Sequence, residues 1–216
     1  MDNILCKIYD TLFARYGNLR WWPAQSPYEV IVGAVLTQNT NWGNVEKAIG
    51  NFNGDITPTR VLSLGQDELK AIIRPAGFFN QKAGYLKAIT EWYAMYDFDA
   101  TRVMALTLND ARNQLLAVKG IGNETADSIL LYAFGFPTFV IDKYTQRFCS
   151  RFILDAGDNY MSCKNYFEKN LPKDAALFNN YHALLVINAK NHCASKPKCA
   201  GCPLEMQCKK ATHPIR

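Results

Sequence analysis

The sequence lacks the features of a membrane or secreted protein. No run of residues is long enough and apolar enough to cross a bilayer. The opening residues 1–5 (MDNIL) have neither the basic region nor the apolar stretch of a signal peptide. The seven cysteines are an odd number, so they cannot all pair as disulfides within the chain. We therefore expect an intracellular, cytoplasmic protein.

Internal repeats, low-complexity tracts and enough strand-like runs for a sheet are also missing. Only VIVGAVL at 30–36 and TFVI at 138–141 have the composition of short strands. A hydrophobic content of 49% excludes disorder, and 216 residues permit one large or two small domains. The net charge of +5 is compatible with a polyanionic partner but does not require one.

The sequence does contain strong helical periodicity. Ile4, Leu5, Ile8 and Leu12 recur at helical spacing before the chain reaches Gly17. Further helices are predicted over 28–37, 43–52, 66–73, 81–96 and 109–118. Glycine and proline fall at the junctions between these segments, and the domain boundary is predicted near Pro137. An all-α fold follows from this pattern.

Four cysteines lie close together near the end of the chain. Five, two and five residues separate Cys193, Cys199, Cys202 and Cys208. Thiolate-only ligation around one tetrahedral centre leaves zinc and an iron–sulfur cluster as the two candidates. Four unrelated free cysteines are the alternative without a metal. Their terminal position indicates a structural clasp rather than a catalytic centre.

The segment from 107 to 134 predicts two helices joined by a tight turn. Thr107 and Asp110 resemble a capping box at the start of the first helix. The sequence KGIG at 119–122 turns the chain, and Asn123 is predicted to cap the second helix. Such a helix–hairpin–helix presents backbone N–H groups and the charge of Lys119 to a phosphate. A structural turn without a ligand is the alternative interpretation.

Asp142 follows an apolar connection and opens the next helix, about twenty residues after the hairpin. The simplest interpretation of this residue is a helix N-cap. A capping carboxylate is also held rigid and stays ionised at neutral pH. The same side chain can therefore serve both structure and chemistry.

The combined pattern resembles the endonuclease III superfamily of DNA glycosylases. VKGIGNETADSILLYAFGFPTFVIDKYTQRF at 118–148 is similar to that family's hairpin, Gly/Pro-rich connection and catalytic aspartate, and the resemblance includes LTQNT, GFFNQKAG and the terminal cysteines. It implies two helical domains with a DNA-binding cleft between them. One is a helical barrel over 20–136 with the helix–hairpin–helix at 109–135. The other comprises 1–19 and 137–216, with a [4Fe–4S] loop at 193–208, although five residues separate the first two cysteines where the family usually has six.

The resemblance also implies the class of chemistry. Strand-cleaving members carry a lysine two places after the second hairpin glycine, and the matching residue here is Glu124, which cannot form a Schiff base. Asp142 matches the catalytic aspartate of the family. We therefore expect a monofunctional N-glycosylase of base excision repair without lyase activity, in which Asp142 stabilises the cationic sugar.

Within that superfamily the motifs are most similar to the 3-methyladenine glycosylase branch. GIGNETAD, the Trp-Trp-Pro at 21–23, VGAVLTQNT and RPAGFFNQKA carry this similarity. It implies that 3-methyladenine or a related alkylated purine is flipped out and stacked on aromatic faces, which favour a cation. The adenine-removing branch carries a glutamate where this chain has Ala34, so the sequence does not match that branch. The predicted base pocket consists of Trp21, Trp22, Pro23 and Trp42.

Further contacts with damaged double-stranded DNA follow from the same motifs. Gln38 matches the residue that fills the gap left by the flipped base, and Phe78 matches the wedge inserted into the opposite strand, with Phe79 as the alternative. Phosphate contacts are predicted at Lys119, Gly120, Gly122, Lys196 and Lys198, with Lys209 and Lys210 beside them. A monomer is expected from the family.

Two alternatives stay open from the sequence. The first is an oxidised-pyrimidine or mismatch glycosylase of the endonuclease III type. The second is a non-catalytic DNA-binding iron–sulfur protein that kept the scaffold. Asp142 argues against the second, because a protein that only binds DNA has no reason to keep a carboxylate facing phosphates.

Overall fold

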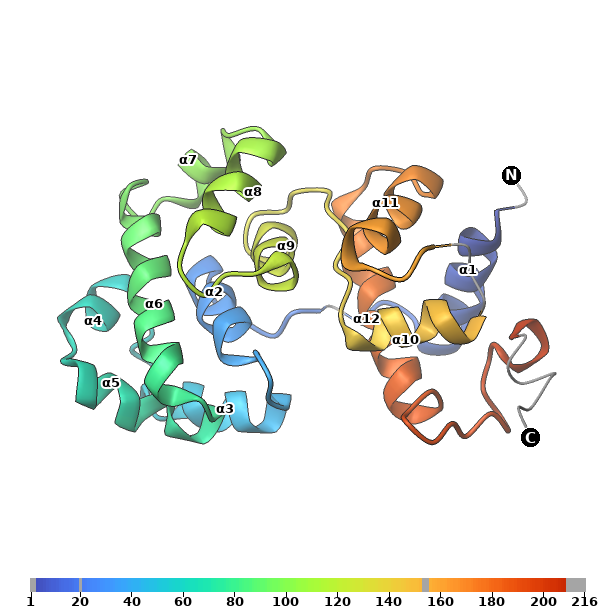
Figure 1. Cartoon of the computed structure of the whole chain (residues 1–216), viewed down its shortest axis with the longest axis horizontal. Coiled ribbons are helices and arrows are strands. Elements are labelled where there is room, and N and C mark those ends of the chain that lie inside the picture. The colour runs from blue at the N-terminus through green and yellow to red at the C-terminus, as the bar shows by residue number, and fades with distance from the viewer. Residues whose placement is uncertain (1–2, 20, 153–155, 209–216) are drawn as a thin grey trace. The chain divides into compact units, whose positions relative to one another are not determined.

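The computed structural model describes residues 3–19, 21–152 and 156–208, and these residues form helices and connections without a strand. The predicted all-α class is therefore confirmed. No described helix is both long and apolar enough to span a bilayer. The elements (Figure 1) are α1 (Ile4–Tyr16), α2 (Pro27–Leu36), α3 (Trp42–Gly50), α4 (Pro58–Ser63), α5 (Gln66–Ile73), η1 (Arg74–Ala76), α6 (Phe79–Ala94), α7 (Ala100–Met104), α8 (Leu108–Ala117), α9 (Asn123–Tyr132), α10 (Lys143–Phe152), α11 (Tyr160–Asn170), α12 (Ala175–Asn191) and η2 (Glu205–Gln207).

The two strand-like segments have different structures. Residues 30–36 lie inside α2, whereas 138–141 are a buried, extended connection without a strand partner among the described residues. The sequence analysis did not predict the short helices α4 and α7. Helix α4 begins at Pro58, because Thr57 caps it by accepting a hydrogen bond from the Arg60 N–H at 3.1 Å and proline suits a first turn.

The chain divides into two compact units, each with its own core. One unit comprises Trp22–Phe136, and the other comprises Met1–Trp21 together with Pro137–Arg216. We refer to them as the hairpin unit and the cysteine unit. The chain therefore leaves the cysteine unit after α1, builds the whole hairpin unit, and then returns.

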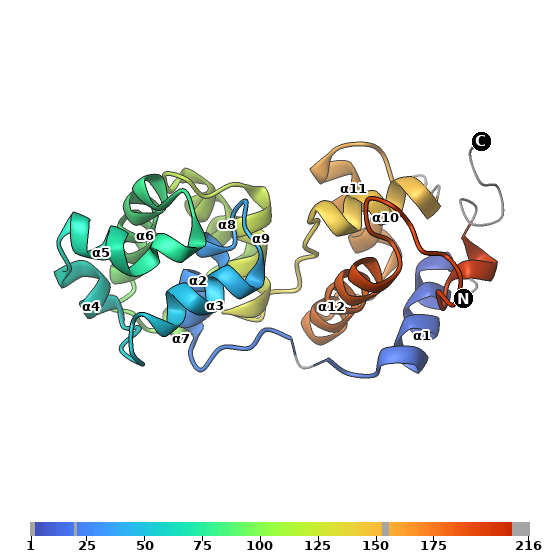
Figure 2. The same ribbon diagram turned by 90° about the horizontal axis from the view of Figure 1, so that it is seen from below.

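In the hairpin unit, α2 lies at the centre. It packs against α6 and α9, while α8 lies along α9 (Figures 1 and 2). Ile31 and Val35 of α2, Leu86 of α6 and Ile129 of α9 are all fully buried in this core. Burial on several faces explains why α2 is apolar nearly throughout. The packing fixes the hairpin between α8 and α9 beside the turn that follows α2.

In the cysteine unit, aromatic residues join α1, α11 and α12. The rings of Phe139 and Phe167 stack with centroids 4.3 Å apart, and Tyr181 of α12 meets both rings edge-on. The Tyr181 hydroxyl donates a hydrogen bond to the Leu5 carbonyl of α1 at 2.8 Å. Helix α10 packs against α12, and this contact determines the surroundings of the residue that opens α10.

Candidate functional site

Helices α8 and α9 form the predicted hairpin. Gly120 has a φ of +85°, and a Cβ added there would lie 2.2 Å from Cδ1 of Tyr85 on α6. Both the backbone conformation and the available space therefore require glycine. Gly122 is the N-cap of α9 and contributes no side-chain acceptor to the N–H groups of the first turn. This helix end suits an anion, and the exposed Lys119 lies three residues before it in sequence.

The prediction that Asn123 caps α9 is wrong. Asn123 is the first residue of the helix, and its Oδ1 accepts a hydrogen bond from Nη2 of Arg112 on α8 at 2.8 Å. Arg112 also forms a bidentate pair with Asp127 of α9, with Nε–Oδ1 at 2.8 Å and Nη2–Oδ2 at 3.1 Å. Asp127 is fully buried. The guanidinium therefore clamps the two helices of the hairpin together.

The turn after α2 contacts the hairpin through Gln38. Its Nε2 donates hydrogen bonds to the Gly120 carbonyl and to Thr125 Oγ1, both at 3.0 Å. The next residue, Asn39, is exposed and has a left-handed φ of +54°. Gap filling by Gln38 would require its amide to break both hydrogen bonds to the hairpin.

Phe78 and Phe79 have different environments. Phe78 is 60% exposed and precedes α6 with a left-handed φ of +47°, an uncommon conformation for a bulky residue. Phe79 packs against the core of the hairpin unit, with the Arg74 guanidinium carbon 5.8 Å from its ring centroid. Of the two residues, Phe78 therefore has the exposure that a wedge needs.

Lys82 of α6 connects the segment before Phe78 to the turn after α2. Its Nζ donates hydrogen bonds to the Ala76 and Leu36 carbonyls, both at 2.8 Å. The side chain is only 1% exposed, and burial lowers its pKa to about 8. One buried amine thus fixes the approach to Phe78 and the end of α2 in a single arrangement.

Three aromatic residues meet in the hairpin unit. The ring centroids of Trp22 and Trp42 are 5.2 Å apart with an interplanar angle of 89°, and those of Trp22 and Tyr132 are 5.1 Å apart. Trp22 lies against Gly33 of α2, where an added Cβ would be 3.2 Å from its Nε1. Tyr132, at the end of α9, joins this cluster although the sequence analysis did not select it. We call Trp22, Trp42 and Tyr132 the aromatic cluster.

Trp21 and Pro23 were predicted to share a pocket with Trp22 and Trp42. Trp21 belongs to the cysteine unit, where Lys190 Nζ of α12 lies 5.9 Å from its ring centroid. The Trp21 Nε1 is buried without a hydrogen-bond partner among the described residues. Pro23 is exposed. The structure therefore groups Trp22 with Trp42, while Trp21 has different neighbours.

Asp142 caps α10 in the cysteine unit. Its Oδ1 accepts a hydrogen bond from the Thr145 N–H at 2.7 Å, and its Oδ2 lies 3.6 Å from Nε2 of His182 on α12. Burial opposes ionisation of this carboxyl, but His182 and Thr145 outweigh that effect and lower the pKa of Asp142. The side chain is 13% exposed. Asp142 is therefore a rigid, mostly buried carboxylate that is ionised at neutral pH.

Sequence reasoning missed His182. The residue is buried in α12, far along the chain from Asp142, and the packing of α10 against α12 brings the two together. The only signal in the sequence was a histidine directly before the apolar run ALLVI at 183–187. Glu124, by contrast, lies exposed in the first turn of α9, at the position selected from the hairpin motif.

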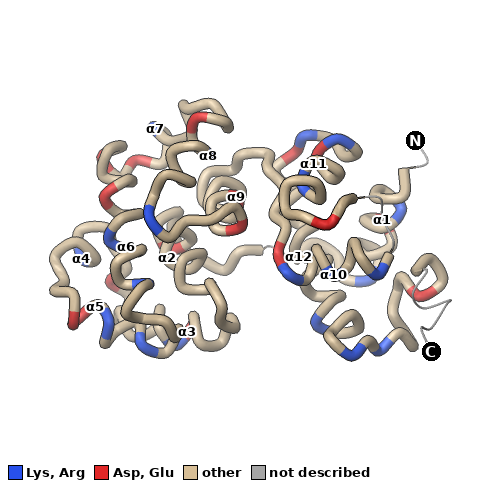
Figure 3. Tube along the Cα trace, in the orientation of Figure 1, with Lys and Arg blue, Asp and Glu red and all other residues tan. Residues whose placement is uncertain are grey.

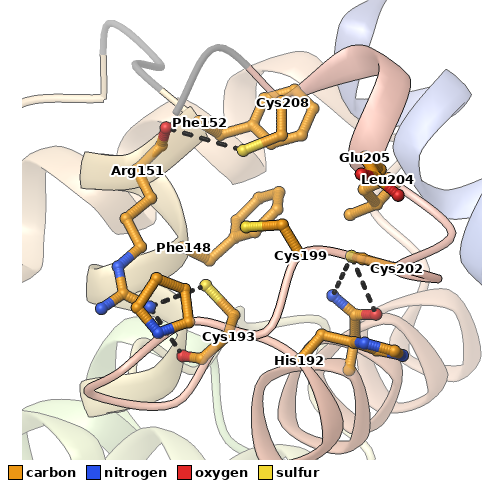
Figure 4. A pocket seen from close by; sticks show the side chains of 12 residues that line it. Phe148, Arg151, Phe152, His192, Cys193, Cys199, Cys202, Leu204, Glu205 and Cys208 are labelled. Atoms are coloured by element: carbon orange, nitrogen blue, oxygen red, sulfur yellow. Dashed lines mark hydrogen bonds between the residues drawn. The ribbon is translucent and has the colours of Figure 1, made fainter. Parts of the chain in front are cut away.

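The four predicted cysteine ligands line one pocket (Figure 4). The pocket has about 440 Å³ of empty space, part of which is open to solvent, and Phe148 and Phe152 of α10 form part of its wall. The sulfurs are distributed around the wall, and no three metal-binding side chains among the described residues converge on one ion position. By its chemistry, an all-thiolate set of this kind fits either zinc or an iron–sulfur centre.

Arginines from α10 hold the backbone of the first cysteine. Arg151 Nη1 donates to the Cys193 sulfur at 3.2 Å and to the Cys193 and Ala194 carbonyls at 3.0 and 2.6 Å. Arg147 Nε donates to the same Cys193 carbonyl at 2.7 Å. On the opposite side, the side-chain amide of Asn188 lies 3.8–3.9 Å from the Cys202 sulfur. A charged donor therefore lies on the Cys193 sulfur and an amide lies beside the Cys202 sulfur, while burial raises the pKa of the Cys202 thiol.

Basic residues recur along α10 and in the segment after α12 (Figure 3). Lys196 and Lys198 of that segment are exposed, as phosphate contacts require. Lys209 and Lys210 lie outside the described residues.

Comparisons with known proteins agree on one family. The family model for HhH-GPD superfamily base excision DNA repair proteins matches residues 32–173. A Methanocaldococcus jannaschii protein, whose name assigns it provisionally to the DNA repair glycosylases, is 44% identical over 95% of this chain and 96% of its own length. The chain belongs to the HhH-GPD superfamily. Endonuclease III of Sulfolobus acidocaldarius is 31% identical over 84% of this chain and 81% of its own.

Solved structures have the same fold. The H. pylori 3-methyladenine DNA glycosylase bound to 1,N6-ethenoadenine aligns with a TM-score of 0.75 and 27% identity over 87% of this chain and 97% of that one. A trapped endonuclease III–DNA covalent intermediate aligns with a TM-score of 0.82 and 22% identity over 98% of this chain and 99% of that one. The family match and the 44% identical relative together show that this HhH-GPD protein is a DNA glycosylase of base excision repair.

Proposed function

We propose that this HhH-GPD glycosylase is monofunctional and excises 3-methyladenine or related alkylated purines by base flipping. The proposal rests on two carboxylates at separate positions, Asp142 and Glu124. Asp142 is buried and held ionised at the position of the catalytic aspartate. Glu124 stands where strand-cleaving members carry their lysine, and a carboxylate cannot form an imine with the sugar.

The chemistry assigned to Asp142 is electrostatic. As the glycosidic bond breaks, its electron pair leaves with the base and positive charge develops on the sugar. A fixed carboxylate stabilises that charge without reorganising, and the Thr145 N–H holds Asp142 in place. Water then adds to the sugar carbon and loses a proton. A base alkylated at a ring nitrogen is already cationic and leaves as a neutral molecule, so little acid catalysis is needed.

The aromatic cluster supports a flat, cationic substrate. Tryptophan gives the strongest cation–π attraction of the aromatic side chains, and Trp22 and Trp42 lie within one cluster with Tyr132. The structural neighbour from H. pylori is a 3-methyladenine glycosylase that shares 27% identity with this chain. We assign base stacking to the cluster, the opposite-strand wedge to Phe78, and phosphate contacts to the hairpin with Lys119, Lys196 and Lys198.

The cysteine pocket is assigned to a [4Fe–4S] cluster. Cys193, Cys199, Cys202 and Cys208 would each bind one iron, and the cluster would supply a covalent clasp for the C-terminal segment. Support for this assignment comes from the resemblance of the four-cysteine segment to the family's cluster loop and from the placement of all four cysteines on one pocket. Protein that is colourless and contains one zinc ion would overturn this assignment.

A substrate panel tests the proposed function. Wild-type protein and Asp142→Asn are incubated with methylated DNA and with defined duplexes containing thymine glycol or a G·T pair. We expect wild-type protein to release 3-methyladenine from an intact strand, and Asp142→Asn to bind the same DNA without releasing base. Borohydride should trap no covalent complex, because no Schiff base forms.

The alternatives predict different outcomes in the same panel. The endonuclease III relatives support an oxidised-pyrimidine or mismatch enzyme, which would process the defined duplexes and leave methylated DNA unchanged. Efficient borohydride trapping would show that another amine, such as Lys119 or Lys143, reaches the sugar. A non-catalytic DNA-binding protein would release no base from any of these substrates.

A further inference from the structure

One acidic side chain is hydrogen-bonded to the aromatic cluster. Trp42 is the first residue of α3, and its Nε1 donates a hydrogen bond to Glu46 Oε1 at 2.9 Å. The two residues are four apart, so they are neighbours on one face of the helix. Trp42 is half-buried, whereas Glu46 is exposed. Sequence analysis selected the tryptophan but not its carboxylate partner.

The position of Trp42 at a helix N-terminus is unfavourable for a cation. The N-terminal end of a helix has a positive potential, and the first turn of α3 contains no acidic residue. A positively charged base stacked on Trp42 would therefore meet repulsion from the end of α3. The first carboxylate along this helix is Glu46, and its hydrogen bond holds that charge at the edge of the indole ring.

The same hydrogen bond changes the indole itself. A carboxylate that accepts the Nε1–H shifts electron density into the ring and makes its π face more negative, which strengthens attraction for a cation. The bond also fixes the ring orientation before the base arrives. A neutral purine benefits from the fixed orientation but not from the added negative charge. The carboxylate of Glu46 therefore increases the preference for a cationic base over a neutral one.

We propose that Glu46 is a specificity-determining residue, which tunes Trp42 and the N-terminus of α3 to select cationic purines over neutral purines of the same shape. The proposal rests on the function proposed above. Because Glu46 is exposed and therefore screened by solvent, its effect on selection is a few-fold rather than absolute.

The test separates the charge of Glu46 from its hydrogen bond. Glu46→Gln keeps an acceptor for the Trp42 N–H but removes the charge, and Glu46→Ala removes both. Tryptophan fluorescence is titrated with 3,9-dimethyladeninium, a permanent cation, and with neutral 9-methyladenine. In parallel, release of 3-methyladenine from methylated DNA is compared with release of neutral ethenoadenine from a duplex. Glu91→Gln, a charge removal at an exposed position of α6, is the matched control.

We expect Glu46→Gln to lower the preference for the cation by about two- to fivefold, with neutral adenine bound as before. Glu46→Ala should lose that preference and also weaken neutral binding, because the ring is no longer held. In a Trp42→Phe background, which has no N–H to donate, Glu46→Gln should change selectivity much less. The control should leave the ratio unchanged.

Two outcomes of this test separate the role of Glu46 from the proposed function. If wild-type protein releases alkylated purines but Glu46→Gln has the wild-type cation preference, the role of Glu46 is wrong and the proposed function stands. If wild-type protein releases no alkylated purine and prefers neither probe, the proposed function fails and the role of Glu46 fails with it. Thermal denaturation of each variant shows whether a lost preference reflects loss of folded protein.

Discussion

Replacing Gly120 with alanine tests how the hairpin is built. Its left-handed conformation costs an L-residue roughly 1–2 kcal/mol. The new Cβ would lie 2.2 Å from the Tyr85 ring, and forcing extra atoms into a packed site costs about 1–3 kcal/mol. Alanine recovers roughly 0.4–1 kcal/mol by restricting the unfolded chain. We therefore expect the free energy of unfolding to fall by about 3 kcal/mol.

Urea denaturation followed by tryptophan fluorescence measures this loss. Gly122→Ala is the matched control, since Gly122 has a φ of −94° and an added Cβ would meet nothing within 4 Å. Tyr85→Ala removes the ring that the new Cβ would meet. In a Tyr85→Ala background, Gly120→Ala should therefore lower the free energy of unfolding only by the cost of the left-handed backbone conformation. If Gly120→Ala unfolds at the same urea concentration as wild type, the contact between α6 and the hairpin turn is not as described.

Three further predictions concern stability and DNA binding. Arg112→Met should lower the unfolding free energy by about 3–5 kcal/mol in urea titrations, because it removes the bidentate guanidinium partner of the buried Asp127; adding Asp127→Leu should restore much of it. Between pH 8 and 10.5, the free energy of unfolding of the wild type should rise relative to that of Lys82→Met, by at most about 3 kcal/mol. In this range Lys82 has lost its proton in the folded chain but keeps it in the unfolded chain. Phe78→Ala should weaken binding to lesion-containing duplex in anisotropy titrations without lowering the melting temperature, whereas Phe79→Ala should lower the melting temperature.

Local hydrogen bonding explains which parts of the fold were predictable. The Thr107 cap and the helix over 66–73 depend on neighbours within a few residues, and both are found as predicted. Asp142 likewise caps its helix through the N–H of a residue three positions on. The cap predicted at Asn123 failed for a non-local reason. Arg112 of α8 binds the oxygen that would have capped the helix, and Gly122 becomes the N-cap.

Tertiary packing explains what the sequence could not predict. The contact of His182 with Asp142 depends on α10 packing against α12, and no periodicity within either helix encodes it. Lys82 has the composition of a surface residue, yet it is buried with two carbonyl acceptors. In both cases the residue type gave no indication of its environment. Only the packed helices determine which charged or polar side chain becomes part of the site.

The Trp-Trp-Pro segment shows why adjacent residues in a motif need separate assignments. The boundary between the two units falls between Trp21 and Trp22. Trp22 packs against Gly33, where any side chain would be tight, while Trp21 lies beside Lys190 of α12. Each tryptophan therefore anchors the connecting chain to its own unit. Either residue can be required for folding without any role in base stacking. A loss of activity on replacing one of them becomes evidence for base stacking only when that unit keeps its stability.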